Sequence, residues 1–212
     1  TIFGYQAGDD IASGGNYNTI YGYNAATKLT TGDASVFIGQ GAGQVHVTGN
    51  RNIAIGHNAM VDTDAGSTSY ASNDNLFIGV DAGGGTWTNT AIQQNVAIGN
   101  YSMDSALNEA QENTAVGYGS LGSITTADKV VAIGFEAGKL ITTGGSNTIV
   151  GAAAGDAMEG ASDAVLIGTS AGGAITSGDY NVVIGKGAGA AISTSDGNTM
   201  VGTFAGQAIT GG

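Results

Sequence analysis

The chain has 212 residues, among them 39 glycines, no proline and no cysteine, and its formal net charge is −12. Without cysteine it can form neither a disulfide framework nor a thiolate metal site. Its acidity argues against nucleic acid or an anionic membrane as a partner. No apolar run reaches the ~20 residues of a membrane span, so we expect no membrane insertion.

A short apolar run that ends in a glycine recurs along the whole chain. Successive copies of this glycine, the anchor of each repeat, lie 17 or 18 residues apart, except at two longer steps of 23 and 20 residues. A fixed period in this range indicates a solenoid, in which each repeat forms one coil and the coils stack. We therefore predict an all-β fold, a parallel β-solenoid (β-roll) of about twelve 17-residue coils, as one continuous array over residues 1–212. The anchors are Gly4, Gly22, Gly39, Gly56, Gly79, Gly99, Gly117, Gly134, Gly151, Gly168, Gly185 and Gly202.

The three residues before each anchor predict one short strand per coil. Side chains alternate along a strand, so the first and third residues share one face and the second lies on the other. Both faces are apolar, as in the coil where Val182 and Ile184 flank Val183. We expect the first and third residues to fill the coil and the second to form an exposed apolar stripe that needs a partner chain. The alternative is a wider coil whose own return segment covers that stripe. The predicted oligomer interface is Ile20, Phe37, Ala54, Phe77, Ala97, Ala115, Ala132, Ile149, Leu166, Val183 and Met200.

Other repeat positions have backbone explanations. The anchor glycine is expected to have a positive φ or no room for a Cβ atom, and an Ala-Gly pair such as Ala171-Gly172 should let successive coils approach closely. Asparagine recurs four residues before the anchor, for example at Asn52 and Asn75, and stacked coils would join these amides in a hydrogen-bonded ladder. The alternative is a polar comb that grips a ligand. Seven residues after the anchor, an apolar side chain such as Ile141 is expected to plug the interior from a second short strand.

Some of these repeats resemble known families. The runs NIAIG at 52–56 and NVAIG at 95–99 resemble the Asn-Ser-Val-Ala-Ile-Gly repeat of the YadA-like head domain in trimeric autotransporter adhesins. The runs NTAVGYGSL at 113–121 and LITTGGSNT at 140–148 resemble repeats of bacteriophage tail fibres more closely. The resemblance implies left-handed coils and three chains about one axis. Because the chain begins within a repeat, at Thr1, we expect it to be a segment of a longer fibre protein.

The two long steps are expected to be loops, because insertions in a solenoid emerge on one face, often the binding face. They follow the anchors Gly56 and Gly79, and the second contains the one tryptophan of the chain. We expect these neighbouring loops to contact a sugar. The alternative is that the tryptophan only packs its loop onto the rod. The candidate ligand-contact residues are Asp62, Asp64, Tyr70, Trp87 and Asn89.

Residue types that could carry metal or catalytic chemistry are scattered. Asp62, Asp64 and Asp74 could offer oxygen ligands to Ca²⁺, but their spacing is not that of an EF-hand loop. The histidines, His46 and His57, have no third ligand nearby and are expected at the surface. The glutamates form no paired-carboxylate motif, so we predict no enzyme, no metal site and no cofactor.

The repeats, the acidity and the expected apolar stripe favour a structural and adhesive rod. The resemblance implies the tail fibre of a virion, assembled as a homotrimer, with loops that attach to host cell-surface polysaccharide. One alternative is an autotransporter adhesin head, extracellular on the bacterial cell surface. Another is an ice-binding solenoid that uses threonine pairs such as Thr125-Thr126 and Thr142-Thr143.

Overall fold

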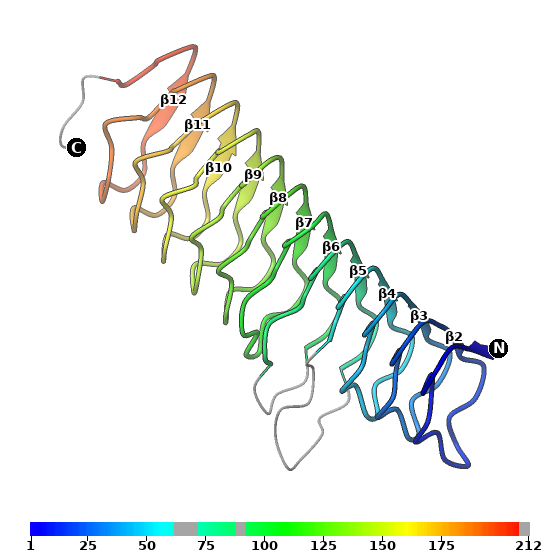
Figure 1. Cartoon of the computed structure of the whole chain (residues 1–212). Helices are drawn as coiled ribbons and strands as arrows, with labels where there is room; N and C mark the ends of the chain where they lie inside the picture. The colour runs from blue at the N-terminus through cyan, green and yellow to red at the C-terminus, as the bar shows by residue number, and fades with distance from the viewer. Residues whose placement is uncertain (62–71, 88–91, 208–212) are drawn as a thin grey trace.

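The computed structural model describes residues 1–61, 72–87 and 92–207. Within these ranges the protein is all-β without helices, and twelve parallel strands form one sheet in chain order (Figure 1). The coils stack into a rod with β1 and β12 at opposite ends (Figure 1). The strands are β1 (Ile2–Phe3), β2 (Thr19–Tyr21), β3 (Val36–Ile38), β4 (Ile53–Ile55), β5 (Leu76–Ile78), β6 (Val96–Ile98), β7 (Thr114–Val116), β8 (Val131–Ile133), β9 (Thr148–Val150), β10 (Val165–Ile167), β11 (Val182–Ile184) and β12 (Thr199–Val201).

Each strand pairs in parallel with the strand one repeat further along the chain, so that Val165 lies opposite Val182. The two long steps do not change this pairing, because Leu76 lies opposite Ile53 on one side and opposite Val96 on the other. The strands therefore stack in about eleven turns. This confirms the predicted parallel β-solenoid and the repeat boundaries read from the anchor glycines.

The two strand faces are reversed relative to the prediction. In β3 the central residue Phe37 is buried, while Val36 and Ile38 on either side are partly exposed. An asparagine precedes most of the strands and lies two residues ahead of the central residue, so alternation puts both side chains on one face. The Asn113 amide donates to the carbonyl of Ala127 across its coil at 2.8 Å, which turns this face inward. The residues predicted as an exposed oligomer interface are therefore core residues buried within a single chain: Ile20, Phe37, Ala54, Phe77, Ala97, Ala115, Ala132, Ile149, Leu166, Val183 and Met200.

Side chains of complementary size, one large and one small, fill the coil interior from two repeat positions. These positions are the central strand residue and the residue four after the anchor. Where the central residue is large, the second position is small, as with Leu166 and Gly172. Three of the four coils with a central alanine have a large residue there instead, as with Ala115 and Leu121, and the fourth combines Ala132 with Gly138. A Cβ atom added at Gly172 would lie 2.8 Å from Leu166 Cδ2. At Gly172 the glycine of the Ala-Gly pair thus makes room for a side chain of its own coil, whereas a Cβ atom at Gly155 would lie 2.8 Å from Leu166 Cδ1 of the next coil. The prediction that small residues here let successive coils approach closely is therefore confirmed at Gly155 and not at Gly172.

Two backbone predictions are confirmed. The anchor glycines have φ between 128° and 146°, and a Cβ atom at Gly117 would lie 2.3 Å from the carbonyl oxygen of Gly134 in the next coil. The asparagines form a ladder, in which Asn113 Nδ2 donates to Asn95 Oδ1 at 3.1 Å and Asn95 Nδ2 donates to Asn75 Oδ1 at 3.3 Å. Because these amides are buried and bonded within the rod, they do not form a polar comb for a ligand.

The return segment of each coil differs from the prediction in one respect. Its apolar plug residues, such as Ile124 and Ile141, are buried as expected. In the residues that the structure describes, however, no second strand forms there. Separate hydrogen bonds join these segments instead: the Thr142 amide and its Oγ1 both donate to the Glu159 carbonyl, at 2.9 and 3.1 Å. The regular sheet is therefore built on one side of each coil.

Candidate functional site

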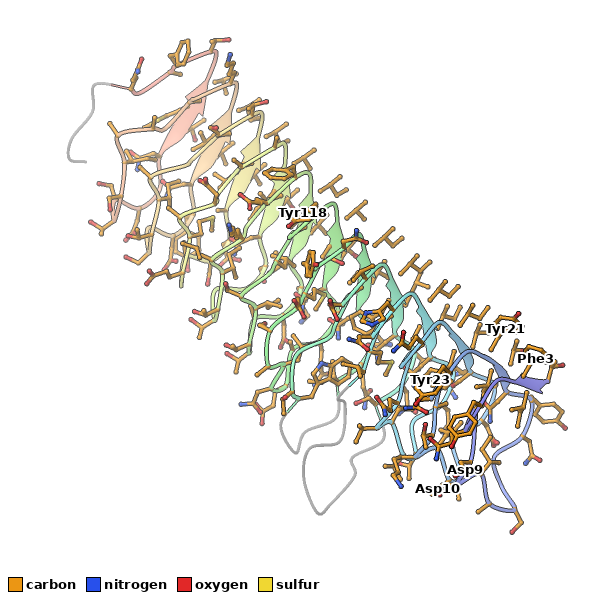
Figure 2. The ribbon with its side chains drawn as sticks, viewed as in Figure 1. Phe3, Asp9, Asp10, Tyr21, Tyr23 and Tyr118 are labelled. Atoms are coloured by element: carbon orange, nitrogen blue, oxygen red, sulfur yellow. The ribbon has the colours of Figure 1, made fainter. Side chains whose placement is uncertain are left out.

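The first and third residues of the strands point away from the coil interior and form what we call the outer sheet face. Their side chains make a carbon-rich row along one edge of the rod, with Tyr21 and Phe3 at its end (Figure 2). The exposed fraction is 40% at Ile133 near the middle and 67% at Val201 near the other end. The outer sheet face comprises Phe3, Thr19, Tyr21, Val36, Ile38, Ile53, Ile55, Leu76, Ile78, Val96, Ile98, Thr114, Val116, Val131, Ile133, Thr148, Val150, Val165, Ile167, Val182, Ile184, Thr199 and Val201.

The outer sheet face carries no charged residue, although the whole chain has a net charge of −12. The charged side chains lie elsewhere, as Asp9 and Asp10 do below the row of outward side chains (Figure 2). Like charges across an interface cost free energy, so an uncharged face is the part of an acidic rod that a second acidic rod can approach. An apolar stripe is therefore present as expected, but different residues form it.

Of the candidate ligand-contact residues in the inserted loops, the structure describes one, Trp87. Trp87 is fully buried, its ring centroid lies 5.6 Å from that of Phe77, and its Nε1 donates to the Gly83 carbonyl at 3.2 Å. The alternative, that Trp87 packs onto the rod, is therefore confirmed, and as a sugar-contact residue Trp87 was wrong, because the indole packs into its coil beside a strand residue. The other candidate contact residues lie outside the described residues: Asp62, Asp64, Tyr70 and Asn89.

A groove of about 310 Å³ lies over the coils that contain β6, β7 and β8, and we call it the Tyr118 groove. The middle coil has glycine both two and five residues after its anchor, at Gly119 and Gly122. The coil before it carries tyrosine and aspartate at these positions, and the coil after it carries glutamate and lysine. Two missing side chains between two pairs of long ones leave the hollow. The groove is lined by Tyr101, Asp104, Tyr118, Gly119, Gly122, Ser123, Glu136 and Lys139.

Aromatic rings form one wall of the Tyr118 groove. The centroids of Tyr101 and Tyr118 lie 5.5 Å apart with their planes at 71°, and Tyr118 stacks on Phe135 at 5.5 Å and 10°. All three side chains are about half exposed. Tyr118 lies on the flank of the rod and not in the row of the outer sheet face (Figure 2). Because each ring is held by its neighbour, the groove offers an apolar surface of fixed geometry.

Carboxyl groups dominate the electrostatics of this groove. Burial and the neighbouring Asp81 raise the pKa of the Asp104 carboxyl to about 6. Lys139 Nζ lies 2.8 Å from Glu136 Oε1, and this hydrogen bond raises the pKa of Lys139. Burial also raises the pKa of Asp156, which interacts with Glu136 and Lys139. The charge of Lys139 is balanced by that of Glu136. The carboxylate of Asp104 therefore makes the groove net negative at neutral pH.

The Tyr118 groove was missed by sequence reasoning. Its signal is present in the aligned repeats: aromatic residues lie one or two positions after the anchors of three successive coils, and only the middle coil has glycine at both positions. Side chains at equal repeat positions become neighbours only when the coils stack in register. The groove lies where successive anchors are 17 or 18 residues apart, so no interruption of the repeat marks it.

Other candidate residues do not converge on a metal or catalytic site. His46 was expected at the surface but is buried. Its Nε2 lies 3.3 Å from the Gly49 carbonyl oxygen and 3.2 Å from Asn52 Nδ2. Burial lowers the pKa of His46 to about 4. Asp74 accepts two hydrogen bonds from Arg51, at 2.6 and 2.8 Å, and these lower the pKa of Asp74. Among the described residues, no group of three or more His, Cys, Asp and Glu side chains could hold a metal ion.

Two further findings concern membrane spans and similarity to known proteins. Over residues 1–61, 72–87 and 92–207, no helix has the length and hydropathy that crossing a membrane requires. No protein-family model, curated protein or solved structure matches the chain. The outer sheet face and the Tyr118 groove are therefore the features from which function has to be argued, and that the chain is not an enzyme stays a prediction.

Proposed function

We propose that this chain is a rod segment of an adhesive fibre, and that three copies associate side by side through the outer sheet face into a homotrimer with left-handed coils. The fibre is the tail fibre of a virion, and it attaches to host cell-surface polysaccharide. The observation that carries the proposal is the uncharged, apolar outer sheet face. The handedness, the number of chains and the virion rest on the resemblance of the repeats to phage tail fibres.

The size of the outer sheet face supports association with a partner. Strands stack about 4.8 Å apart, so twelve of them give a face roughly 55 Å long and, with two side chains abreast, about 10 Å wide. An area on the order of 550 Å² is at the upper end of the largest apolar patches on monomers. It approaches the ~800 Å² that each partner buries in a standard interface.

A second copy of the chain is the partner that fits this face best. The face repeats at a constant spacing along a straight edge, so an identical rod matches it over its whole length. A rotation axis parallel to the rod lets every copy present the same face and closes the assembly. The absence of charge on the face removes the repulsion that two acidic chains would otherwise have.

Light scattering on the purified chain tests the assembly. We expect a mass of three times the 20.7 kDa chain. Ile133→Lys places a charge on the outer sheet face and should dissociate the assembly, while Leu140→Lys is the matched control, because Leu140 is exposed to a similar fraction (42% against 40%) but lies outside that face. A stable dimer would refute the trimer and keep the interface. A monomer at micromolar concentration, or dissociation by both variants alike, would refute the proposal.

Two alternatives predict other outcomes. An autotransporter adhesin would be followed by a membrane anchor in the full-length protein, whereas a tail fibre would be joined to a tail-attachment domain or a cleaved chaperone. Ice binding has less support, because the hydroxyls of Thr125 and Thr142 donate to carbonyl oxygens of the next coil at 3.0 and 3.1 Å. Thermal hysteresis of the purified chain would favour ice binding over the rod proposal.

A further inference from the structure

The Tyr118 groove is not explained by the rod or by its assembly. Only one of the twelve repeats has glycine both two and five residues after its anchor, so the hollow is not a property of the repeat. Tyr118 lies on the flank of the rod, away from the outer sheet face (Figure 2). The rings of Tyr101 and Tyr118 line the hollow, and Phe135 in the next coil stacks on Tyr118. These features together call for a ligand.

We propose that the Tyr118 groove binds an amino sugar unit of a surface polysaccharide, with the sugar ring packed against Tyr101 and Tyr118 and its ammonium group beside Asp104. The inference rests on the proposed function for the source of the sugar, but the binding itself does not depend on the assembly of the rod.

The size and the aromatic walls of the groove fit a sugar. A volume of about 310 Å³ is at the lower end of the range for small-molecule sites, which run from ~300 to ~1,000 Å³. That is enough for a mono- or disaccharide unit and too small for a folded partner. The C–H groups of a pyranose ring are apolar and carry partial positive charge, so they pack well on the face or edge of a tyrosine ring. The steep angle of 71° between Tyr101 and Tyr118 lets one ring lie under the sugar and the other beside it.

The polar lining selects the type of sugar. Asp104, Glu136 and Ser123 provide oxygen atoms that accept hydrogen bonds from sugar hydroxyl or ammonium groups. Lys139 is already paired with Glu136 at 2.8 Å, so the negative charge of Asp104 is left for the ligand. An ammonium group gains a charge-assisted hydrogen bond and an attraction to the aromatic faces. A uronic or sialic acid would instead bring a carboxylate into a net negative groove.

Isothermal titration calorimetry at pH 7 with four disaccharides tests the proposal: a glucosamine disaccharide, its N-acetylated form, cellobiose and digalacturonate. We expect millimolar binding of the glucosamine disaccharide, roughly fivefold weaker binding of the two neutral sugars, and no binding of digalacturonate. Asp104→Asn should remove the preference for the amino sugar. Choline chloride is the comparison for a cation without a sugar ring, and we expect it to bind more weakly than the glucosamine disaccharide.

Two substitutions of residues that line the groove test whether the sugar binds there. Tyr118→Ala removes the central ring, and Tyr180→Ala is its control, because Tyr180 is also exposed but lies outside the groove. Gly119→Asn fills the hollow: a Cβ atom there would come no closer than 3.5 Å to Glu136 Cγ, and Asn58 has the required positive φ at the same repeat position. We expect Tyr118→Ala and Gly119→Asn to weaken binding at least tenfold, and Tyr180→Ala to leave it unchanged.

The outcomes separate this inference from the rod proposal. If the Ile133→Lys chain still binds the glucosamine disaccharide, the groove is independent of assembly, whatever the mass of the native chain. Equal binding of the glucosamine disaccharide to the native chain and to Gly119→Asn would refute binding in the Tyr118 groove. Choline binding as tight as that of the glucosamine disaccharide would show a cation site and overturn the sugar assignment, and so would tighter binding of digalacturonate.

Discussion

The size match inside the coils predicts that two damaging substitutions compensate each other. In the coil of Leu166 the partner position is Gly172, and in the coil of Ala115 it is Leu121, with the plug residues Ile175 and Ile124 at the same place in both coils. The double variant Leu166→Ala/Gly172→Leu converts the first arrangement into the second. We expect it to be far more stable than the single variants imply.

The magnitudes follow from the structure. Leu166→Ala empties a fully buried position, which costs about 2–5 kcal/mol. Gly172→Leu alone puts a Cβ atom 2.8 Å from Leu166 Cδ2, an overpacking that costs about 1–3 kcal/mol. It also puts a leucine at a positive φ, which costs about 1–2 kcal/mol. In the double variant the cost of the positive φ remains, together with the 3.0 Å approach of the new Cβ atom to Ile175 Cδ1. Leu121 already takes φ of 52° at this repeat position in a coil that has isoleucine at the same plug position, so we expect both costs to be small.

A double-mutant cycle by urea unfolding, followed by circular dichroism at one fixed protein concentration, measures the coupling. We expect a coupling free energy of at least ~2 kcal/mol in the favourable direction. Leu166→Ala combined with Gly43→Leu is the control, because Gly43 faces Phe37 in a distant coil and the two costs should add. If Leu166→Ala and Gly172→Leu also add to within ~0.5 kcal/mol, the size match is not what fills the coil.

Three other substitutions test the backbone and the buried polar groups. Gly117→Ala should lower the free energy of unfolding by more than ~3 kcal/mol or prevent folding. The reason is that the site has φ of 132° and that its Cβ atom would lie 2.3 Å from the Gly134 carbonyl oxygen. A loss of stability under ~1 kcal/mol by urea unfolding would contradict this. Asn113→Leu leaves the buried carbonyl of Ala127 without its 2.8 Å hydrogen bond and should cost about 2–4 kcal/mol in the same assay, more than an exposed substitution could. His46 has a pKa lowered to about 4 against ~6.5 when unfolded, so between these values the unfolded chain binds more protons than the folded chain. The neutral His46 therefore contributes about 3 kcal/mol to the free energy of unfolding above pH 6.5, and this contribution is lost as the pH falls through 4. Urea unfolding as a function of pH should show this loss in the native chain and not in His46→Gln.

Periodicity alone determined the architecture of this protein. The anchor glycines predicted the coil boundaries and the sheet, because only glycine fits where φ is strongly positive and where the next coil passes within contact distance of the Cα atom. The asparagine ladder was predictable for a related reason, since equal positions must meet when coils stack. The insertions around 62–70 and 81–89 could be recognised as interruptions of the repeat, but not as a site.

The tertiary structure decided which face of each strand lies inside and where the surface is hollow. Both strand faces are apolar, so hydrophobicity could not tell them apart; the inward amides of the asparagines, such as Asn113, do so by bonding across the coil. Trp87 likewise looks the same in the sequence whether it packs inward or faces solvent. The Tyr118 groove arises from residues one repeat apart, around Gly119 and Gly122, and its shape depends on side chains from three coils at once. Such features are contacts between coils, and a repeat pattern describes each coil only one at a time.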